Sequence, residues 1–215
     1  MSAISNSVAF RNFSPTLLAD VLGAGQVMDS GIRPLGSSQQ MERVVGPAFT
    51  VRCAPGDNLM LHAAIYRAEP GSVVVVESGE RHLALAGGNV CAIAERRGIA
   101  AFILDGMIRD LAEVRALGFP VFARGVIPCA AAKDAVAPLN RPVQCGGVTV
   151  EPGDIIVADE EGIVVVPHRD QDAVRRAAQD KMVEEADLSL DGWEQAHRAR
   201  VDELLHQHGF RDQGR

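Results

Sequence analysis

Residues 98–110 read Gly98-Ile-Ala-Ala-Phe-Ile-Leu-Asp-Gly-Met-Ile-Arg-Asp110, an apolar run that begins at a glycine and ends in a charged turn. A short apolar run between turn residues is typical of a buried strand, which we expect over Ile99–Leu104. We expect a helix before it, from Gly87-Gly88 to Arg97, and another after it, from Arg109 to Leu117. Helices that alternate with strands in this way predict parallel pairing through right-handed crossovers.

The preceding sequence continues the pattern. Ser14-Pro15 predicts a helix start, because serine caps helices and proline suits the first helical position. Strands are expected at Val44–Cys53 and Ser72–Glu77, and Asp57 is a candidate cap for a helix between them.

The last third of the chain differs. Short apolar segments broken by Gly and Pro-Gly turns over Val143–Pro167 indicate an antiparallel meander, and two amphipathic helices are expected at Asp172–Asp187 and Asp191–His208. We therefore predict an α/β domain over residues 1–167. Residues 168–215 would form a helical extension that packs on the core or on a neighbouring subunit.

Composition excludes several classes of protein. The 215 residues carry a net charge of −7, which argues against nucleic-acid binding. No apolar run approaches the roughly 20 residues of a membrane span, and the first residues do not resemble a secretory signal, so we expect a cytoplasmic protein. The four cysteines, which lack zinc spacing, are interpreted as buried thiols: Cys53, Cys91, Cys129 and Cys145.

Candidate chemistry lies where the central strand is expected to end, since ligands bind at that edge of open α/β sheets. Arg109 offers a planar fork of donors for a carboxylate, and Asp110 offers oxygens suited to Mg²⁺ or Mn²⁺. The alternative interpretation is an exposed ion pair at a helix start.

A second candidate is the segment Gly87-Gly88-Asn89-Val90. At the start of a helix, backbone N–H groups and the dipole attract anions, so these residues could share a ligand with Arg109. The alternative is a tight turn that requires glycine.

Several motifs, in order and at consistent spacing from about Ser14 to Pro167, resemble the RraA-like family. These motifs are Gly56-Asp-Asn-Leu-Met-Leu-His62, Gly87-Gly88, Arg97-Gly98, Asp105-Gly-Met-Ile-Arg-Asp110, Gly118-Phe-Pro-Val121, Pro152-Gly153-Asp154 and Ala158-Asp-Glu-Glu-Gly-Ile-Val-Val-Val-Pro167. The family includes class II 4-hydroxy-4-methyl-2-oxoglutarate and 4-carboxy-4-hydroxy-2-oxoadipate aldolases.

The resemblance implies a swivelling-domain-like α/β/α sandwich assembled into a homotrimer or homohexamer. It also implies metal-dependent cleavage of a 2-oxo acid to pyruvate, as in aromatic degradation, with oxaloacetate decarboxylation as a further activity. By position, Arg109 is similar to the arginine that grips the pyruvyl group, Asp110 to the metal ligand, and Gly87–Val90 to the backbone cradle. Glu184 or Glu185, from a neighbouring subunit, matches a glutamate near the metal.

One position departs from the family pattern. The aldolases carry an acid 21 residues before the arginine, where this chain has Gly88. Retro-aldol cleavage must remove a hydroxyl proton and decarboxylation need not, so we expect decarboxylation to survive better unless another base serves. Candidate replacement bases are Glu77, Glu80, His82 and His62.

Three other functions stay open. The family's namesake binds and inhibits a ribonuclease, but its branch lacks the aspartate that this chain keeps as Asp110. A phosphohistidine swivelling domain would need a histidine that positions 89–91 do not supply. The scaffold could also act on another 2-oxo or 2-hydroxy acid, for which Asp57, Asn58 and His62 are candidate lining residues.

Overall fold

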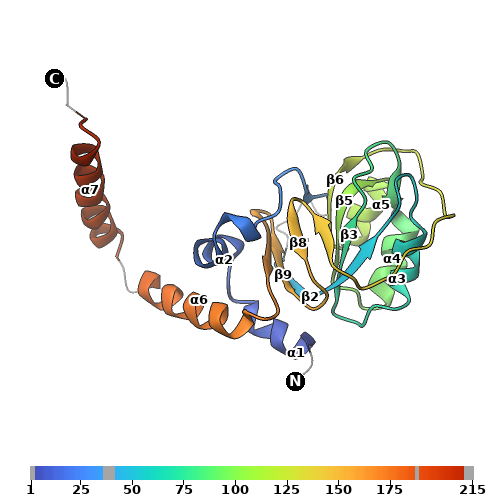
Figure 1. Cartoon of the computed structure of the whole chain (residues 1–215), viewed down its shortest axis with the longest axis horizontal. Helices are drawn as coiled ribbons and strands as arrows, with labels where there is room; N and C mark the ends of the chain where they lie inside the picture. The colour runs from blue at the N-terminus through green and yellow to red at the C-terminus, as the bar shows by residue number, and fades with distance from the viewer. Residues whose placement is uncertain (1–2, 36–41, 187–188, 211–215) are drawn as a thin grey trace. The chain divides into compact units, whose positions relative to one another are not determined.

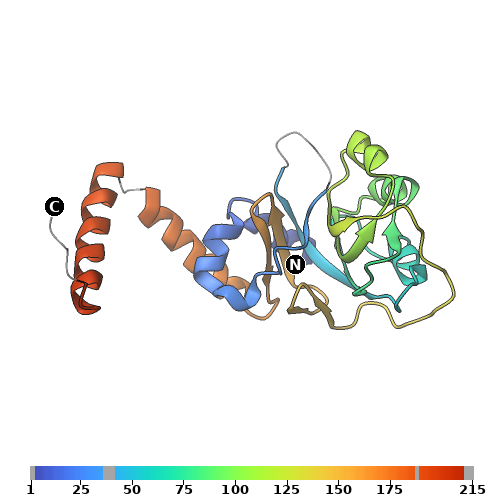
Figure 2. The ribbon, with the colours of Figure 1, turned by 90° about the horizontal axis from the view of Figure 1, so that it is seen from above.

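The computed structural model describes residues 3–35, 42–186 and 189–210. The chain divides into two units, Met1–Ala178 and Gln179–Arg215. The ribbon is drawn in Figure 1 and, from above, in Figure 2. Each unit is described by itself below.

A mixed sheet forms the centre of the first unit. Four strands pair in parallel in the order β6-β5-β3-β2, and antiparallel strands extend the sheet on both sides. The parallel strands are β2 (Val44–Arg52), β3 (Val73–Glu77), β5 (Ala101–Ile108) and β6 (Val121–Val126). The antiparallel ones are β1 (Arg33–Pro34), β9 (Ile155–Asp159) and β10 (Gly162–Val166), and β4 (Ala84–Ala86) pairs in parallel with the far end of β5.

The helices begin and end where the sequence places turn residues. Their bounds are α1 (Ala3–Ser7), α2 (Pro15–Leu22), α3 (Leu59–Ile65), α4 (Gly88–Arg96) and α5 (Leu111–Leu117), with short 3₁₀ turns at Val8–Phe10 and Ala24–Gln26. The Ser14 hydroxyl accepts the N–H of Leu17, as the expected cap requires, and Gly23 and Gly118 end their helices at positive φ.

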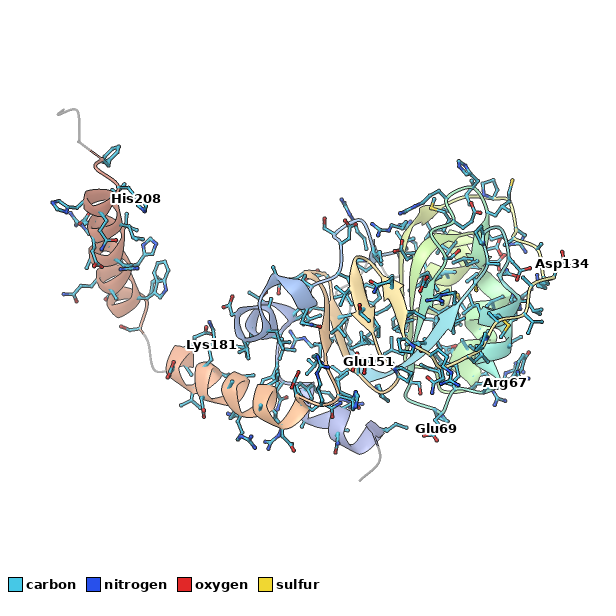
Figure 3. All side chains as sticks on the ribbon, viewed as in Figure 1. Arg67, Glu69, Asp134, Glu151, Lys181 and His208 are labelled. Atoms are coloured by element: carbon cyan, nitrogen blue, oxygen red, sulfur yellow. The ribbon has the colours of Figure 1, made fainter. Side chains whose placement is uncertain are left out.

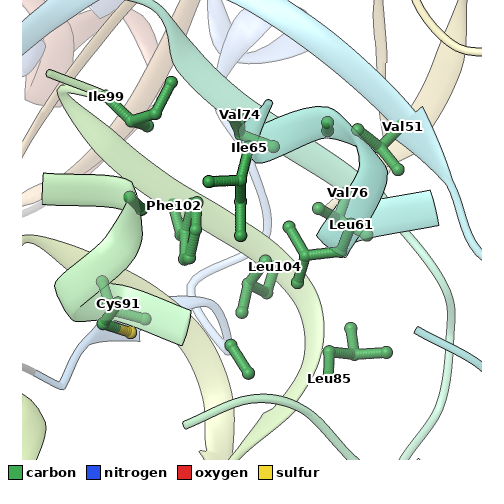
Figure 4. Packing of buried hydrophobic residues seen from close by; sticks show 14 of the residues in the cluster. Val51, Leu61, Ile65, Val74, Val76, Leu85, Cys91, Ile99, Phe102 and Leu104 are labelled. Carbon is green, nitrogen blue, oxygen red and sulfur yellow. The ribbon is translucent and has the colours of Figure 1, made fainter. Parts of the chain in front are cut away.

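Two apolar clusters cover the faces of the sheet. One contains side chains of α3, α4 and α5 packed on β3 and β5, among them Ile65, Cys91 and Phe102 (Figure 4). The other contains residues of the hairpin β7 (Val143–Cys145) and β8 (Val148–Val150), packed on the opposite face. The predicted α/β fold is confirmed, and this hairpin forms part of the layer opposite α3–α5.

The central strand is longer than the sequence predicts. β5 continues from Leu104 through Ile108, although Asp105 interrupts the apolar run. Asp105 is accommodated because Arg124 Nε and Gly146 N donate to its carboxylate at 2.8 and 3.0 Å. Burial alone would raise the pKa of Asp105, but these bonds outweigh burial and the pKa lies below its ordinary value.

The expected meander is two separate hairpins. β7 and β8 pair only with each other among the described strands, whereas β9 and β10 join the main sheet beside β2. Turn residues mark both hairpins in the sequence, but they do not reveal which sheet each hairpin joins.

The C-terminal helices are α6 (Gln171–Ala186) and α7 (Leu190–Gln207). α6 begins in the first unit, where Val174 and Ala178 are buried, and no residue of α7 is buried. The packing of this region on a neighbouring subunit stays a prediction. Within the described ranges, none of the helices combines the length and apolar character that crossing a bilayer requires.

Gly46 in β2 provides a test of sheet packing. A Cβ at this position would collide with the carbonyl oxygen of Gly71 and lie 3.1 Å from Val73 Cγ2. We expect Gly46→Ala to lower the free energy of unfolding by about 1–3 kcal/mol, measured by urea denaturation. Gly25→Ala is the matched control, since a Cβ there meets nothing within 4 Å, and equal stability of the two variants would contradict this account.

Candidate functional site

A pocket lies at the carboxyl ends of β4 and β5. Most of the predicted site residues line it: Gly87, Asn89 and Val90 from α4 and its cap, and Arg109 and Asp110 from the turn after β5. Gly88 is not among the lining residues, but its N–H donates to Asp110 Oδ2 at 3.2 Å. The structure thus brings the two stretches that the sequence singled out into one site.

A main-chain hydrogen bond fixes the distance between the start of α4 and the Arg109–Asp110 turn. Arg109 N donates to the carbonyl of Ala86 at 2.9 Å, directly before the glycine that caps α4. A Cβ at Gly87 would lie 3.0 Å from Arg109 Cγ and would collide with the Asp110 carboxylate. Only glycine therefore allows the start of α4 to lie this close to the Arg109–Asp110 pair.

Asp110 has an unusual backbone conformation, with φ 56° and ψ 39°. Aspartate is among the few side chains that adopt this left-handed region readily, and such strain is often found at functional sites. Arg109 Nε lies 3.4 Å from Asp110 Oδ2, and both side chains are partly exposed.

The pocket also contains three polar residues outside the predicted pyruvyl site: Asn58 and His62, from the start of α3, and Lys133, from the loop after β6. Sequence reasoning offered Asn58 and His62 as lining residues and missed Lys133. Lys133 lies in an irregular segment without periodicity or a recognisable motif, so the sequence carried no signal for it.

Asp57 fastens that loop to α3. Its carboxylate accepts N–H bonds from Leu59 at 2.8 Å, as an N-terminal helix cap would, and from Asp134 and Ala135 at 2.5 and 3.1 Å. Asp134 is labelled on the loop in Figure 3. Burial would raise the pKa of Asp57, but the three N–H donors outweigh it and the pKa is lowered.

Asn58 and His62, which line the pocket from α3, each carry a buried polar atom that has no hydrogen-bond partner within the described residues, Asn58 Oδ1 and His62 Nε2. Asn58 is 4% exposed, and its Nδ2 donates to the carbonyl of Leu85 at 2.9 Å. Burial, followed by the charge of Lys133, lowers the pKa of His62, so the imidazole is neutral at pH 7.

The other candidate bases face elsewhere. Glu77 is bound by Arg52 at 2.9 Å and by the N–H of Gln144 at 2.7 Å. Glu80 accepts the N–H groups of Arg81 and His82. Of the four candidates, His62 alone is among the residues that line the pocket.

Gly88 has an acidic neighbour in space. A Cβ at this position would lie 2.9 Å from Glu113 Cβ and would collide with Glu113 Oε2. The carboxylate of α5 thus occupies the space beside Gly88 into which a side chain would extend. A Gly88→Asp substitution, the change that would restore the family acid, would have to displace Glu113.

The donor set suits one kind of metal site. Within the described residues no three His, Cys, Asp or Glu side chains cluster closely enough to hold an ion by themselves. Mg²⁺ is commonly held by one or two carboxylates together with substrate oxygens and water, and Asp110 offers one such carboxylate. Glu184 and Glu185 belong to the second unit, and their place near a metal in a neighbouring subunit stays a prediction.

The cysteines do not line the pocket. Burial raises the pKa of Cys53 to about 11 and that of Cys91 to about 12, and it also raises the pKa of Cys145. Cys129 is exposed, so the expectation of four buried thiols is wrong at that position.

Comparisons with known proteins agree with the fold and the motifs. Residues 15–165 match the family model for RraA-like proteins, described as Aldolase/RraA. A protein of Halalkalibacterium halodurans, provisionally named 4-hydroxy-4-methyl-2-oxoglutarate aldolase, is 38% identical over 200 residues, which cover 92% of this chain and 94% of that protein. A protein of Albidiferax ferrireducens with the same provisional name is 36% identical, over 70% of this chain and 90% of its own.

Solved structures with this fold include proteins described as inhibitors. RraAS2 of Streptomyces coelicolor, described as an unusual member of the RNase ES inhibitor RraA family, has a TM-score of 0.75 and 29% identity, covering 85% of this chain and 94% of its own. The RNA-processing inhibitor RraA from Thermus thermophilis has a TM-score of 0.64 and 28% identity, and the match covers 71% of this chain and 91% of that protein.

Asp57 should control both stability and the loop that carries Lys133. We expect Asp57→Asn to cost about 1–3 kcal/mol of unfolding free energy at pH 7, because the charge-assisted bonds that a buried carboxylate accepts from three N–H groups are weakened. The folded-state pKa is depressed, so the stabilisation is complete above the ordinary carboxyl pKa of about 3.9 and disappears as the pH falls through the folded value. The difference in stability between wild type and variant should therefore shrink as the pH falls below the ordinary carboxyl pKa, measured by urea denaturation at each pH.

Asp154→Asn is the matched control. Asp154 is also buried and accepts two backbone N–H bonds, from Glu151 and His168, but it does not line the pocket. Both variants should be less stable, whereas only Asp57→Asn should speed amide hydrogen exchange at Asp134 and Ala135. Unchanged exchange at these two amides would show that Asp57 does not hold the loop.

Proposed function

Since this chain belongs to the RraA-like family, we propose that it is a lyase that cleaves a carbon–carbon bond of a 2-oxo acid and releases pyruvate. Relatives provisionally named aldolases point to this reaction class. The observation that carries the proposal is the convergence of the Arg109–Asp110 pair and the first turn of α4 on one pocket. The substrates proposed are 4-hydroxy-4-methyl-2-oxoglutarate, 4-carboxy-4-hydroxy-2-oxoadipate and oxaloacetate.

Arg109 and the start of α4 would bind the pyruvyl part of the substrate. The guanidinium donates to the carboxylate and to the 2-oxo oxygen, and the N–H groups of Asn89 and Val90 lie in the first helical turn, where N–H groups have no partner within the helix. When the bond breaks, negative charge develops on the 2-oxo oxygen. A cation already fixed beside that oxygen stabilises the charge without reorganisation.

Asp110 would hold a divalent ion, Mg²⁺ or Mn²⁺, together with oxygens of the substrate. Such an ion, when bound, acts as a Lewis acid that stabilises enolate charge. The Gly88 N–H restrains one carboxylate oxygen of Asp110, so the side chain is oriented before any ligand arrives. Lys133 adds a second cation to the pocket, which favours substrates that carry a second carboxylate.

The alternative is a non-catalytic regulator that binds a ribonuclease or another protein. Structural neighbours described as RNA-processing inhibitors favour it. It predicts that substitutions in the pocket leave the function intact, and that a ribonuclease co-purifies with the chain in a pull-down.

Pyruvate release from oxaloacetate and from 4-carboxy-4-hydroxy-2-oxoadipate tests the proposal. We expect release with Mg²⁺, loss with EDTA, and a loss of roughly 100-fold or more in Asp110→Ala, because Lewis-acid stabilisation contributes several kcal/mol. Asp170→Ala is the matched control. It removes an aspartate that also follows an arginine, with Arg169 Nε 3.5 Å from Asp170 Oδ2, but that lies outside the pocket.

Each result separates the two functions. Release that survives both EDTA and Asp110→Ala would contradict the role given to Asp110. No release from either substrate by the wild-type protein would leave the regulator as the better description.

A further inference from the structure

Asn58 and His62 lie four residues apart at the start of α3, and both line the pocket. The N–H of His62 donates to the carbonyl of Asn58 at 3.2 Å, so the two side chains lie on the same face of the first helical turn. Each presents a buried atom without a partner among the described residues, Asn58 Oδ1 and His62 Nε2.

Asn58 Oδ1 and His62 Nε2 can each act as a hydrogen-bond acceptor. The amide of Asn58 is oriented by the bond from its Nδ2 to Leu85 O, which leaves Oδ1 as an acceptor without a partner among the described residues. His62 is neutral near pH 7, and with its proton on Nδ1 it presents Nε2 as a second acceptor. Two buried acceptors are complementary to a ligand that carries a donor.

The proposed substrates differ in whether they carry a hydrogen-bond donor. Carboxylates and the 2-oxo group accept hydrogen bonds and donate none at neutral pH. A 4-hydroxy-2-oxo acid has a hydroxyl donor at the carbon whose bond to C3 is broken, whereas the keto form of oxaloacetate has none. The α3 side of the pocket is thus complementary to the hydroxyl-bearing substrates.

We propose that His62 is the general base for aldol cleavage in this protein and that Asn58 positions the substrate hydroxyl. Asn58 Oδ1 and His62 Nε2 face the C4 hydroxyl, and Nε2 takes its proton. The O–H electron pair forms the new C4 carbonyl, the C3–C4 bond breaks, and its electron pair passes to C3 and the 2-oxo oxygen as the enolate of pyruvate. The imidazolium then returns the proton through solvent to C3. This inference rests on the proposed function and deepens it.

Charged neighbours support the assignment. Lys133 lowers the proton affinity of the imidazole, and Asp57, which raises it, is already engaged by three backbone N–H groups. Arg109 and Asp110 line the same pocket at the pyruvyl end. A neutral imidazole near Lys133 is therefore available as a base at the pH where a free histidine is partly protonated.

The experiment compares His62→Gln with wild type on 4-hydroxy-4-methyl-2-oxoglutarate and on oxaloacetate, each with saturating Mg²⁺. We expect kcat on the hydroxy substrate to fall by roughly 10²–10⁴-fold, the usual contribution of a general base, and kcat on oxaloacetate to change by less than about threefold. Oxaloacetate turnover also shows that the variant is folded. His82→Gln, which alters an exposed histidine outside the pocket, should leave both activities unchanged.

The pH profile provides a second readout that does not depend on the stability of a variant. Wild-type kcat on the hydroxy substrate should fall as the pH drops below the lowered pKa of His62, and this acidic limb should be missing for oxaloacetate. Equal losses on both substrates in His62→Gln, or an acidic limb shared by both, would overturn the assignment. Wild-type activity on oxaloacetate alone would overturn the assignment of His62 and leave the proposed lyase function intact. Activity on neither substrate would overturn the assignment and the proposed function together.

Discussion

The hydrogen bond from Arg109 N–H to the Ala86 carbonyl joins the two segments on which the site depends. It links the end of β5 to the end of β4, and the glycine cap of α4 follows directly. Because β4 pairs with only the last residues of β5, the extension of β5 beyond Leu104 is needed for this bond to form. The sheet therefore positions the Arg109–Asp110 turn and the N-terminus of α4 relative to each other through main-chain geometry.

Two carboxylates, one buried and one partly buried, have a related structural role. Asp105 joins β5 to Arg124 of β6 and to the turn of the β7–β8 hairpin, and Asp57 joins the start of α3 to the loop that carries Lys133. Each loses solvation at a cost that hydrogen bonds from cations or N–H groups offset. Each joins segments that are far apart in the sequence, and Asp57 in this way holds the loop that carries Lys133 beside α3.

Local signals in the sequence predicted much of the fold. The Ser14 cap, the glycines that end helices, and the apolar runs of β2, β3 and β5 all depend on near neighbours in the chain, so their elements were located to within a few residues. The end of β5 and the split of the meander into two hairpins depend on partners distant in sequence. No propensity of Asp105 itself indicates that Arg124 will satisfy it.

The same distinction applies to the site. Arg109, Asp110 and Gly87–Val90 were found because family motifs and strand ends mark them, and the structure places all but Gly88 along the pocket. Lys133 and the nearness of Glu113 to Gly88 were missed, since both depend on how loops and helices meet. The choice of His62 among four candidate bases likewise needed coordinates, because the sequence cannot show which side chains are already bound.

The resulting pocket is chemically asymmetric. Its pyruvyl end offers a guanidinium, a helix start and a carboxylate, which are suited to a 2-oxo acid and a divalent ion. Its α3 end offers two neutral acceptors beside a lysine, which are suited to a hydroxyl next to a second carboxylate. A decarboxylase would need only the first end, because loss of CO₂ removes no hydroxyl proton. Under the proposed assignment, a substrate that brings a hydroxyl donor uses the acceptors at the second end and oxaloacetate does not, so the two ends of the pocket together agree with the proposed aldol cleavage.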